Sequence, residues 1–204
     1  LLRRDGEGRL VVADAMNEID RLGLVAPEAH YISLQGRMAL NAGATRRVLR
    51  AMGTSVTTAE LESRYFAAGS MFWFRREALA DFTAATLDPL FPPEKGQLDG
   101  TAAHAAERLF APLAERHGFM TAGEEAVKPL RQAFAEGAVD RETLQALADG
   151  EAERTTNPFV WPMPRFWRRH PYALILAHHL YVRTPAPIWG VARRLFKRVT
   201  RDRA

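Results

Sequence analysis

The chain has 204 residues, of which 47% are hydrophobic, so it can form one domain with a packed core and is not intrinsically disordered. It contains no cysteine, which excludes disulfide bonds, a thiolate nucleophile and cysteine-ligated metals, and which fits a cytoplasmic protein. The formal net charge of +4 is uneven: residues 165–204 hold ten Lys and Arg against one acid, whereas residues 1–164 carry a net charge of −5. The basic character therefore belongs to the C-terminal segment and does not predict nucleic acid binding.

The first 120 residues alternate predicted helices and strands, a pattern that favours an α/β fold. The elements are recognised from apolar residues at helical spacing, from short apolar runs, and from glycine and proline at their ends. In chain order, the sequence predicts a short helix near 16–22, a buried strand at 22–27, a helix at 41–53, a second buried strand at 65–74, a helix at 75–87, a loop at 88–100 and a long helix at 101–118.

The rest of the chain is predicted to be mostly helical. Short helices are expected around 123–136 and 139–149, followed by a proline-rich connector at 155–164 and two closing helices at 165–184 and 187–201. We therefore expect three parts, namely an α/β region at 1–120, a helical connector at 121–164 and a basic amphipathic helical tail at 165–204.

The predicted helix at 187–201 has two different faces. Ile188, Val191, Leu195 and Val199 form an apolar stripe, and arginine and lysine crowd another arc. This pattern is typical of a helix lying on an anionic membrane surface. It equally fits a terminal helix that docks on the body and exposes its basic face to water.

Gly69 and Ser70 interrupt the apolar run "YFAAGSMFWF" of the second predicted strand. A glycine inside a strand indicates either a bulge or a close approach by another backbone or a ligand. In the second case Trp73 would pack beneath the break and the Ser70 hydroxyl would face a polar ligand. Aromatic rings beside small polar residues suit sugars, which present both apolar faces and hydroxyl groups.

Asp99 stands where the loop at 88–100 gives way to the long helix. A carboxylate at a helix start is either a simple cap or, held ionised there, a general base. Glu94 is the competing candidate for the base. Thr101, His104 and Arg108 share one helix face at i, i+3 and i+7, where a single histidine is more often structural than catalytic.

No metal site is predicted from this chain's own residues. The adjacent histidines, His178 and His179, point about 100° apart on a helix and cannot easily bind one ion. The sequence also contains no HExxH, DxD or CxxC motif.

The segments "YFAAGSMFWFRREAL" and "FPPEKGQLDGTAAHAAERLFAPLAERHGF" together resemble the rhamnan synthesis protein F family. That family has a block of the type "aGtMFW.RpeaL" before one of the type "fp.E.gq.DGTlaHa.ERl", ending in a glycine–aromatic pair. The resemblance runs from about Leu22 to Phe119, and "LGLVAPEAHYISL" also fits it. The family is linked to bacterial cell-surface polysaccharides such as rhamnans and O-antigen.

The resemblance implies a glycosyltransferase of GT-A type, which transfers a sugar from a nucleotide-sugar donor to a glycan or lipid-linked acceptor. This chain would be the C-terminal, acceptor-side half, followed by a helical region. A divalent cation, Mg²⁺ or Mn²⁺, would be bound mainly by residues upstream of it. Asp99, or in its place Glu94, would be the catalytic base. The substrate-binding residues would be Gly69, Ser70, Trp73, Gly100, Thr101, His104 and Arg108.

The resemblance also implies work at the inner face of the plasma membrane, where lipid-linked acceptors lie and where residues 187–201 would bind the anionic surface. Two functions of other classes remain open at the level of sequence. One is a non-catalytic module that binds a glycan or a partner enzyme, and the other is a peripheral membrane adaptor.

Overall fold

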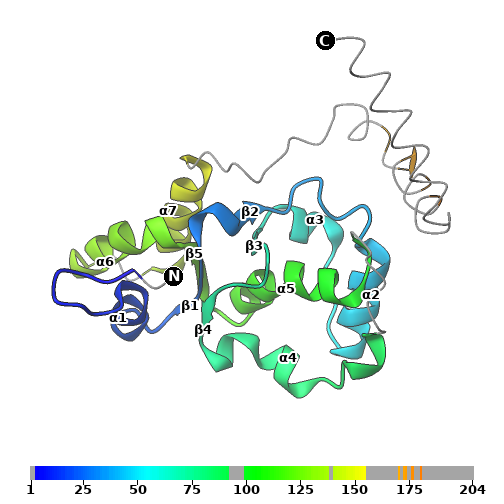
Figure 1. The fold of residues 1–204 in the computed structure, drawn as a ribbon, viewed down its shortest axis with the longest axis horizontal. Helices are drawn as coiled ribbons and strands as arrows, with labels where there is room; N and C mark the ends of the chain where they lie inside the picture. The colour runs from blue at the N-terminus through cyan, green and yellow to red at the C-terminus, as the bar shows by residue number, and fades with distance from the viewer. Residues whose placement is uncertain are drawn as a thin grey trace, which may run out of the picture. The chain divides into compact units, whose positions relative to one another are not determined.

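The computed structural model describes residues 3–91, 99–137 and 140–154, together with five positions between 170 and 180 (Figure 1). The chain divides into two compact units, Leu1–Pro162 and Met163–Ala204. Glu94, the connector at 155–164 and the predicted helix at 187–201 lie outside the described residues. Within the part that is described, no helix combines the length and the hydropathy needed to cross a bilayer.

A three-stranded sheet lies at the centre of the first unit, in the order β4-β1-β5. Its middle strand, β1, is the predicted strand at 22–27, and all five of its residues are buried, which explains its continuous apolar sequence. β1 pairs parallel with β5 and antiparallel with β4, where Val25 faces Trp73. The bounds are β1 Leu22–Ala26, β4 Trp73–Phe74 and β5 Met120–Gly123.

The apolar run at 65–74 forms two strands rather than the single predicted one. β3, Tyr65–Ala67, pairs antiparallel with β2, Tyr31–Ser33, in a separate two-stranded sheet. Gly69 and Ser70 have φ angles of 83° and 53°, both in the left-handed region, so the backbone turns between β3 and β4. The predicted bulge within one strand is therefore wrong, and the approach of a ligand to this turn stays a prediction.

The long predicted helix is confirmed as α5, Ala102–Arg116, which Gly118 follows with a φ of 83°. Its apolar face shares a core cluster with the helix α2 and with Leu34, Leu61 and Phe66. The other elements on this side are α2 Ala42–Ala51, α3 Thr58–Glu62, α4 Ala80–Ala84 and the 3-10 turns η1 Glu28–His30, η2 Arg76–Leu79 and η3 Asp88–Leu90.

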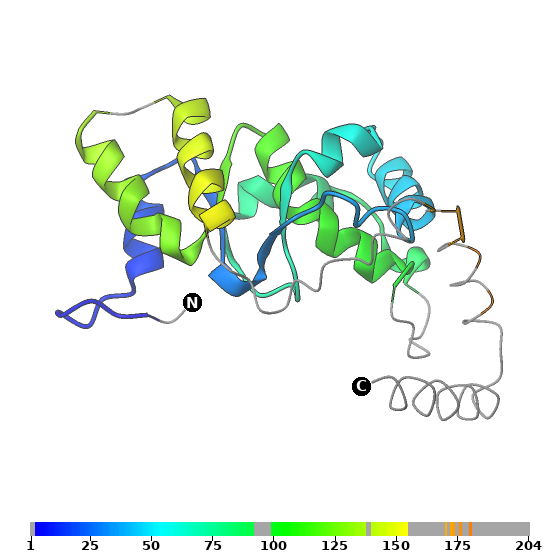
Figure 2. The ribbon, with the colours of Figure 1, turned by 90° about the horizontal axis from the view of Figure 1, so that it is seen from above.

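A second core cluster joins the start of the chain to its later helices. Val12 and Ile19 pack with Met120, Leu130 and Leu144 across β1 and β5. In Figure 2 the helices of this cluster gather on one side of the sheet, opposite α5, α2 and α3. They are α1 Val11–Glu18, η4 Glu124–Ala126, α6 Val127–Ala135 and α7 Arg141–Arg154.

The domain boundary expected at residue 120 is therefore not present. β5 begins at Met120 and pairs with β1, and α6 and α7 cover the core that α1 opens. The expected connector at 121–164 thus supplies a strand and two helices to the same compact unit as far as α7 ends. Over the described residues the fold is mixed α/β, with two small sheets and many helices.

Candidate functional site

Thr101 is the residue that starts α5. Its backbone is extended, with φ −93° and ψ 169°, and its Oγ1 accepts the backbone N–H of His104 at 3.3 Å. This is the geometry of an N-cap. Asp99 lies two residues earlier, so its carboxylate is free of the capping role that was one of its two expected functions.

Asp99 instead forms an ion pair with Arg108, two turns into α5. The Asp99 carboxylate lies 3.3 Å from Nη2 of Arg108, and their side chains are 20% and 11% exposed. Arg108 also donates from Nη1 to the carbonyl of His104 at 2.9 Å and lies 5.4 Å from the centre of the Phe66 ring. The guanidinium is thus fixed on several sides, and it holds the Asp99 carboxylate in place.

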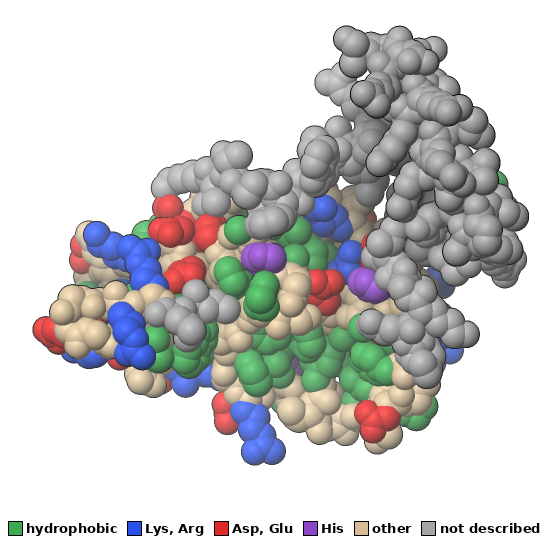
Figure 3. Space-filling model, in the orientation of Figure 1, with side chains coloured by type: hydrophobic (Ala, Val, Ile, Leu, Met, Phe, Trp, Pro, Cys, Tyr) green, Lys and Arg blue, Asp and Glu red, His purple; other side chains and the backbone are tan. Residues whose placement is uncertain are grey.

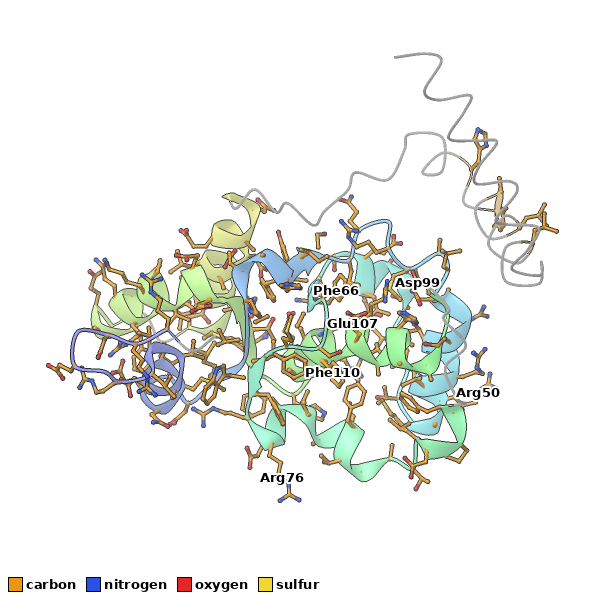
Figure 4. All side chains as sticks on the ribbon, viewed as in Figure 1. Arg50, Phe66, Arg76, Asp99, Glu107 and Phe110 are labelled. Carbon is orange, nitrogen blue, oxygen red and sulfur yellow. The ribbon has the colours of Figure 1, made fainter. Side chains whose placement is uncertain are left out.

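Glu107 connects the turn at Gly69 to α5. Its Oε1 accepts the backbone N–H of Gly69, and its Oε2 lies 3.3 Å from Nη1 of Arg108. Figure 4 shows Glu107 on α5 and Asp99 near the start of this helix. The two sequence blocks, some thirty residues apart, therefore meet on one face of this helix.

Asn41 was missed as a member of the site. It precedes α2, where its residue type suggests a helix cap, yet its side chain makes no capping bond. Its Oδ1 accepts the backbone N–H of Gly100 at 3.0 Å, and the residue is fully buried. The start of α2 thereby holds the Asp99–Gly100 segment against the body.

Arg37 is a second residue that the sequence did not indicate. Its carbonyl accepts Nε of Arg108 at 3.4 Å, and its own Nε donates to the carbonyl of Ser33 at 2.9 Å. Burial and the nearby charge of Arg108 lower the pKa of Arg37 below its usual value. The positive charges of Arg37 and Arg108 therefore repel each other beside the start of α5.

The imidazole of His104 is held in this cluster through one of its two ring nitrogens. Its Nδ1 lies 2.7 Å from Oγ1 of Thr101, which fixes the orientation of the ring. Within the described part of the chain, Nε2 bonds to no protein group and the residue is partly exposed. An imidazole held through one nitrogen can give or accept a hydrogen bond through the other.

The sequence suggested that Trp73 packs beneath the break at Ser70, but the structure places it elsewhere. It sits in β4 and packs against the core cluster of α1, α6 and α7. Ser70 is exposed at the turn, and the apolar residues exposed nearby are Met71 at 47% and Phe74 at 51%. Figure 3 shows hydrophobic side chains gathered over β4 and α4 on this face.

The charged cluster does not resemble a metal centre. Asp99 and Glu107 both lie 3.3 Å from Arg108, so each carboxylate already has a cationic partner. No group of three or more histidine and carboxylate residues suited to a metal ion exists among the described residues. The described residues of this cluster therefore do not fit a divalent cation.

A second polar network, buried between α5, β5 and α7, was not predicted. Thr121 donates from Oγ1 to Glu115 at 2.9 Å. Its backbone N–H donates to Oε1 of Gln145, and its carbonyl accepts from Nε2 of the same side chain. The Tyr31 hydroxyl lies 2.8 Å from the same Oγ1. Burial raises the pKa of Glu115 to about 7, against the attraction of Arg64 at 2.8 Å.

No protein-family model matches this chain, and no solved structure matches it. The chain is similar to the uncharacterized protein WxcX of Xanthomonas campestris pathovar campestris, in strains B100 and ATCC 33913. Each is 37% identical over 107 residues, which make up 52% of this chain and 15% of the relative. The resemblance to the rhamnan synthesis protein F family stays a prediction.

Proposed function

We propose that this chain is part of a glycosyltransferase-like protein that builds a bacterial cell-surface polysaccharide of the rhamnan or O-antigen type. The observation that supports this most directly is the meeting of the two family-like blocks. The Gly69 N–H binds Glu107, and Asp99 pairs with Arg108, the next residue of the same helix. Residues that are distant in sequence thus form one cluster of acid, base and hydrogen-bonding groups.

In the proposed reaction, Asp99 accepts the proton of an acceptor hydroxyl. The hydroxyl oxygen attacks the anomeric carbon of the donor sugar, and the bond from that carbon to the nucleoside diphosphate breaks. Arg108 keeps the Asp99 carboxylate oriented, with 3.3 Å between the charged groups. His104 positions the acceptor through Nε2, since its Nδ1 is held by Thr101.

The exposed turn is the proposed contact for the sugar. Ser70 supplies a hydroxyl, and the half-exposed Met71 and Phe74 supply apolar surface beside it. Aromatic rings with one exposed face suit the apolar face of a sugar ring. Trp73 has no part in this contact, because it packs into the core on the other side of β4.

The donor is a nucleotide sugar, and the acceptor is a glycan or a lipid-linked glycan at the inner face of the plasma membrane. Residues 187–201 bind the anionic surface there, and any Mg²⁺ or Mn²⁺ is held mainly by residues outside this chain. Glu94 stays the alternative base.

The test is nucleotide release, as UDP or dTDP, by the full-length protein carrying Asp99→Asn. A positioned base contributes about 10²–10⁴-fold, so we expect kcat to fall by that factor. Asp88→Asn is the matched control, because Asp88 is exposed and its side chain has no hydrogen-bond partner among the described residues. Because Asp99→Asn also weakens the partly buried ion pair with Arg108, the thermal unfolding of each variant is measured in parallel.

A second candidate function is a non-catalytic glycan-binding or partner-binding module. It is favoured by one feature, namely that Asp99 and Glu107 already have protein partners. If Asp99→Asn retains turnover but loses thermal stability, the carboxylate is only the counter-ion of Arg108. If no nucleotide sugar is turned over by the wild-type protein, the enzymatic proposal fails and the binding module takes its place.

A further inference from the structure

The C-terminal end of α2 carries a cavity that the proposed function does not use. Its volume is about 410 Å³, and it is formed by the last turns of the helix and the loop to α3. α2 has ten residues, so its two ends are about 15 Å apart. Asn41 holds the candidate site at the opposite end of the same helix. The lining residues are Arg46, Leu49, Arg50, Gly53, Thr54, Ser55 and Val56.

The cavity is positively charged. Arg46 and Arg50 are one turn apart on the exposed face of α2, and no acid is among the lining residues. In the described part of the chain neither arginine forms an ion pair, and Arg46 uses only Nε, on the carbonyl of Ala42 at 3.4 Å. Figure 4 shows Arg50 on the outer side of α2. Two guanidinium groups therefore face the cavity with free N–H donors.

These arginines are not needed to cap the helix. The N–H of Thr54 bonds to the carbonyl of Leu49 at 3.0 Å, and that of Gly53 bonds to Arg50 at 3.1 Å. Gly53 has a φ of 67°, so the end of α2 is a complete Schellman motif. The backbone thus satisfies two of the last carbonyls itself. The terminal guanidinium nitrogens of Arg46 and the guanidinium of Arg50 have no partner within the described residues.

The loop beyond Gly53 supplies further donors. The hydroxyls of Thr54 and Ser55 and the backbone N–H of Ser55 and Val56 have no partner within the described residues. Arg116, at the end of α5, donates to the carbonyl of Ser55 at 3.1 Å. This bond fixes the loop against the body, so the donors are held in place before any ligand arrives.

We propose that this cavity binds a phosphate group, with Arg46 and Arg50 holding its oxygens and the 54–56 loop completing the contacts. Arginine binds phosphate through paired N–H donors, and hydroxyl and backbone N–H groups complement it. The phosphate belongs either to a small soluble ester or to a lipid headgroup, because the chemistry that recognises it is the same. The inference is independent of the proposed sugar transfer.

The test uses the full chain and two probes, inorganic phosphate in calorimetric titration and phosphatidylglycerol vesicles in co-sedimentation. The double variant Arg46→Gln/Arg50→Gln is compared with Arg47→Gln. Arg47 is exposed on the same helix but does not line the cavity, and Arg47→Gln removes one charge. The single variants Arg46→Gln and Arg50→Gln, which also remove one charge each, are measured beside it so that the loss of charge is matched. All three arginines are on the surface, and the variants are expected to fold.

We expect affinity for at least one probe to fall tenfold or more in the double variant and less than twofold in Arg47→Gln, since a hydrogen bond to a charged group contributes about this much. A loss confined to inorganic phosphate identifies a soluble ester, and a loss confined to vesicles identifies a headgroup. The proposal is overturned if the wild type binds neither probe, or if Arg47→Gln weakens binding as much as the double variant does.

Discussion

Glu115 lies almost fully buried near the C-terminal end of α5, where its carboxylate joins separate elements. One oxygen accepts from Thr121 at 2.9 Å, and the other lies 2.8 Å from Arg64. Arg64 is half-exposed, so water weakens its attraction, and burial raises the pKa of Glu115 to about 7. The ionised form of this side chain is therefore a cost to the folded protein near neutral pH.

The stability of the fold should for this reason fall as the pH rises. The pKa of Glu115 is about 7 when folded and near the ordinary 4.5 when unfolded, so the folded state binds the extra proton between these values. The stabilisation of the fold by proton binding at Glu115 is complete below about pH 4.5 and is lost as the pH passes 7. It amounts to on the order of 3 kcal/mol of unfolding free energy. We expect the free energy of unfolding, measured with urea, to fall as the pH rises from 4.5 to 8 in the wild type. This slope with pH should be lost in Glu115→Gln.

The effect of Glu115 is isolated by comparing the wild type with Glu115→Gln at the same pH. Other groups titrate over the same range, so the quantity of interest is the difference in unfolding free energy between wild type and variant at each pH. Glu77→Gln, an exposed substitution on η2, is the control and should leave the slope unchanged. A wild-type-minus-Glu115→Gln difference that stays constant from pH 4.5 to 8 contradicts the prediction.

At the scale of elements, β1 packs against its neighbours through a glycine. A Cβ at position 23 would lie 2.5 Å from Cβ of Phe119 and 3.0 Å from that of Ala78. Both neighbours are anchored by their own backbone, so neither can withdraw by changing a rotamer. The absence of a side chain at Gly23 is therefore what lets the start of β5 and the turn η2 approach β1.

Gly23→Ala should destabilise the protein by about 1–3 kcal/mol, the usual cost of overpacking a core. Gly150→Ala is the matched control, because Gly150 lies in α7 with open space around its Cα. That change should instead stabilise by roughly 0.5–1 kcal/mol, since alanine favours a helix over glycine. Thermal unfolding of both variants checks the pair, and equal midpoints would show that β1 tolerates the extra methyl group.

The elements that could be predicted from the sequence are those with strong local signals. The strand at 22–27, an apolar run that Pro27 ends, is confirmed as β1. The helices at 41–53 and 101–118 are confirmed as α2 and α5, because apolar periodicity and terminal glycines define them. The predicted helices near 123–136 and 139–149 are confirmed as well, as α6 and α7.

The short elements escaped prediction because their signals are spread over too few residues. β2 and β5 have three and four residues, and their partners are distant strands. The split of 65–74 into β3 and β4 has the same origin, since an apolar run does not reveal which strand each half will pair with.

Only the part of the candidate site that lies on one helix could be predicted, because its spacing is a local signal. Thr101, His104 and Arg108 were placed together from helical spacing, and the structure confirms that they interact. Asn41 and Arg37 belong to other segments, and only tertiary packing brings them to the start of α5. The buried network of Tyr31 and Thr121 spans 90 residues of sequence, beyond the reach of any local pattern.

At the scale of the whole molecule, the second core cluster depends on both ends of the first unit. Val12, Met16 and Ile19 come from α1, and their partners are contributed mostly by β5, α6 and α7. The partners beyond residue 120 are Ala122, Ala126, Val127, Leu130, Leu144 and Ala148. A chain that ends at residue 120 keeps α1 and β1 but leaves their apolar faces uncovered.

The compact unit Leu1–Pro162 should therefore fold alone, whereas residues 1–120 should not. Each large side chain of this cluster that loses its burial costs about 1.5–3 kcal/mol, and several such losses equal the whole stability of a typical domain, about 5–15 kcal/mol. We expect residues 1–162 to unfold in one cooperative urea transition with near-ultraviolet circular dichroism like that of the full chain. Residues 1–120 should show no such transition, because β1 would lose its parallel neighbour β5 and the helices that cover it. Cooperative unfolding of both fragments at one midpoint would place the boundary at residue 120 after all and make α6 and α7 an accessory layer.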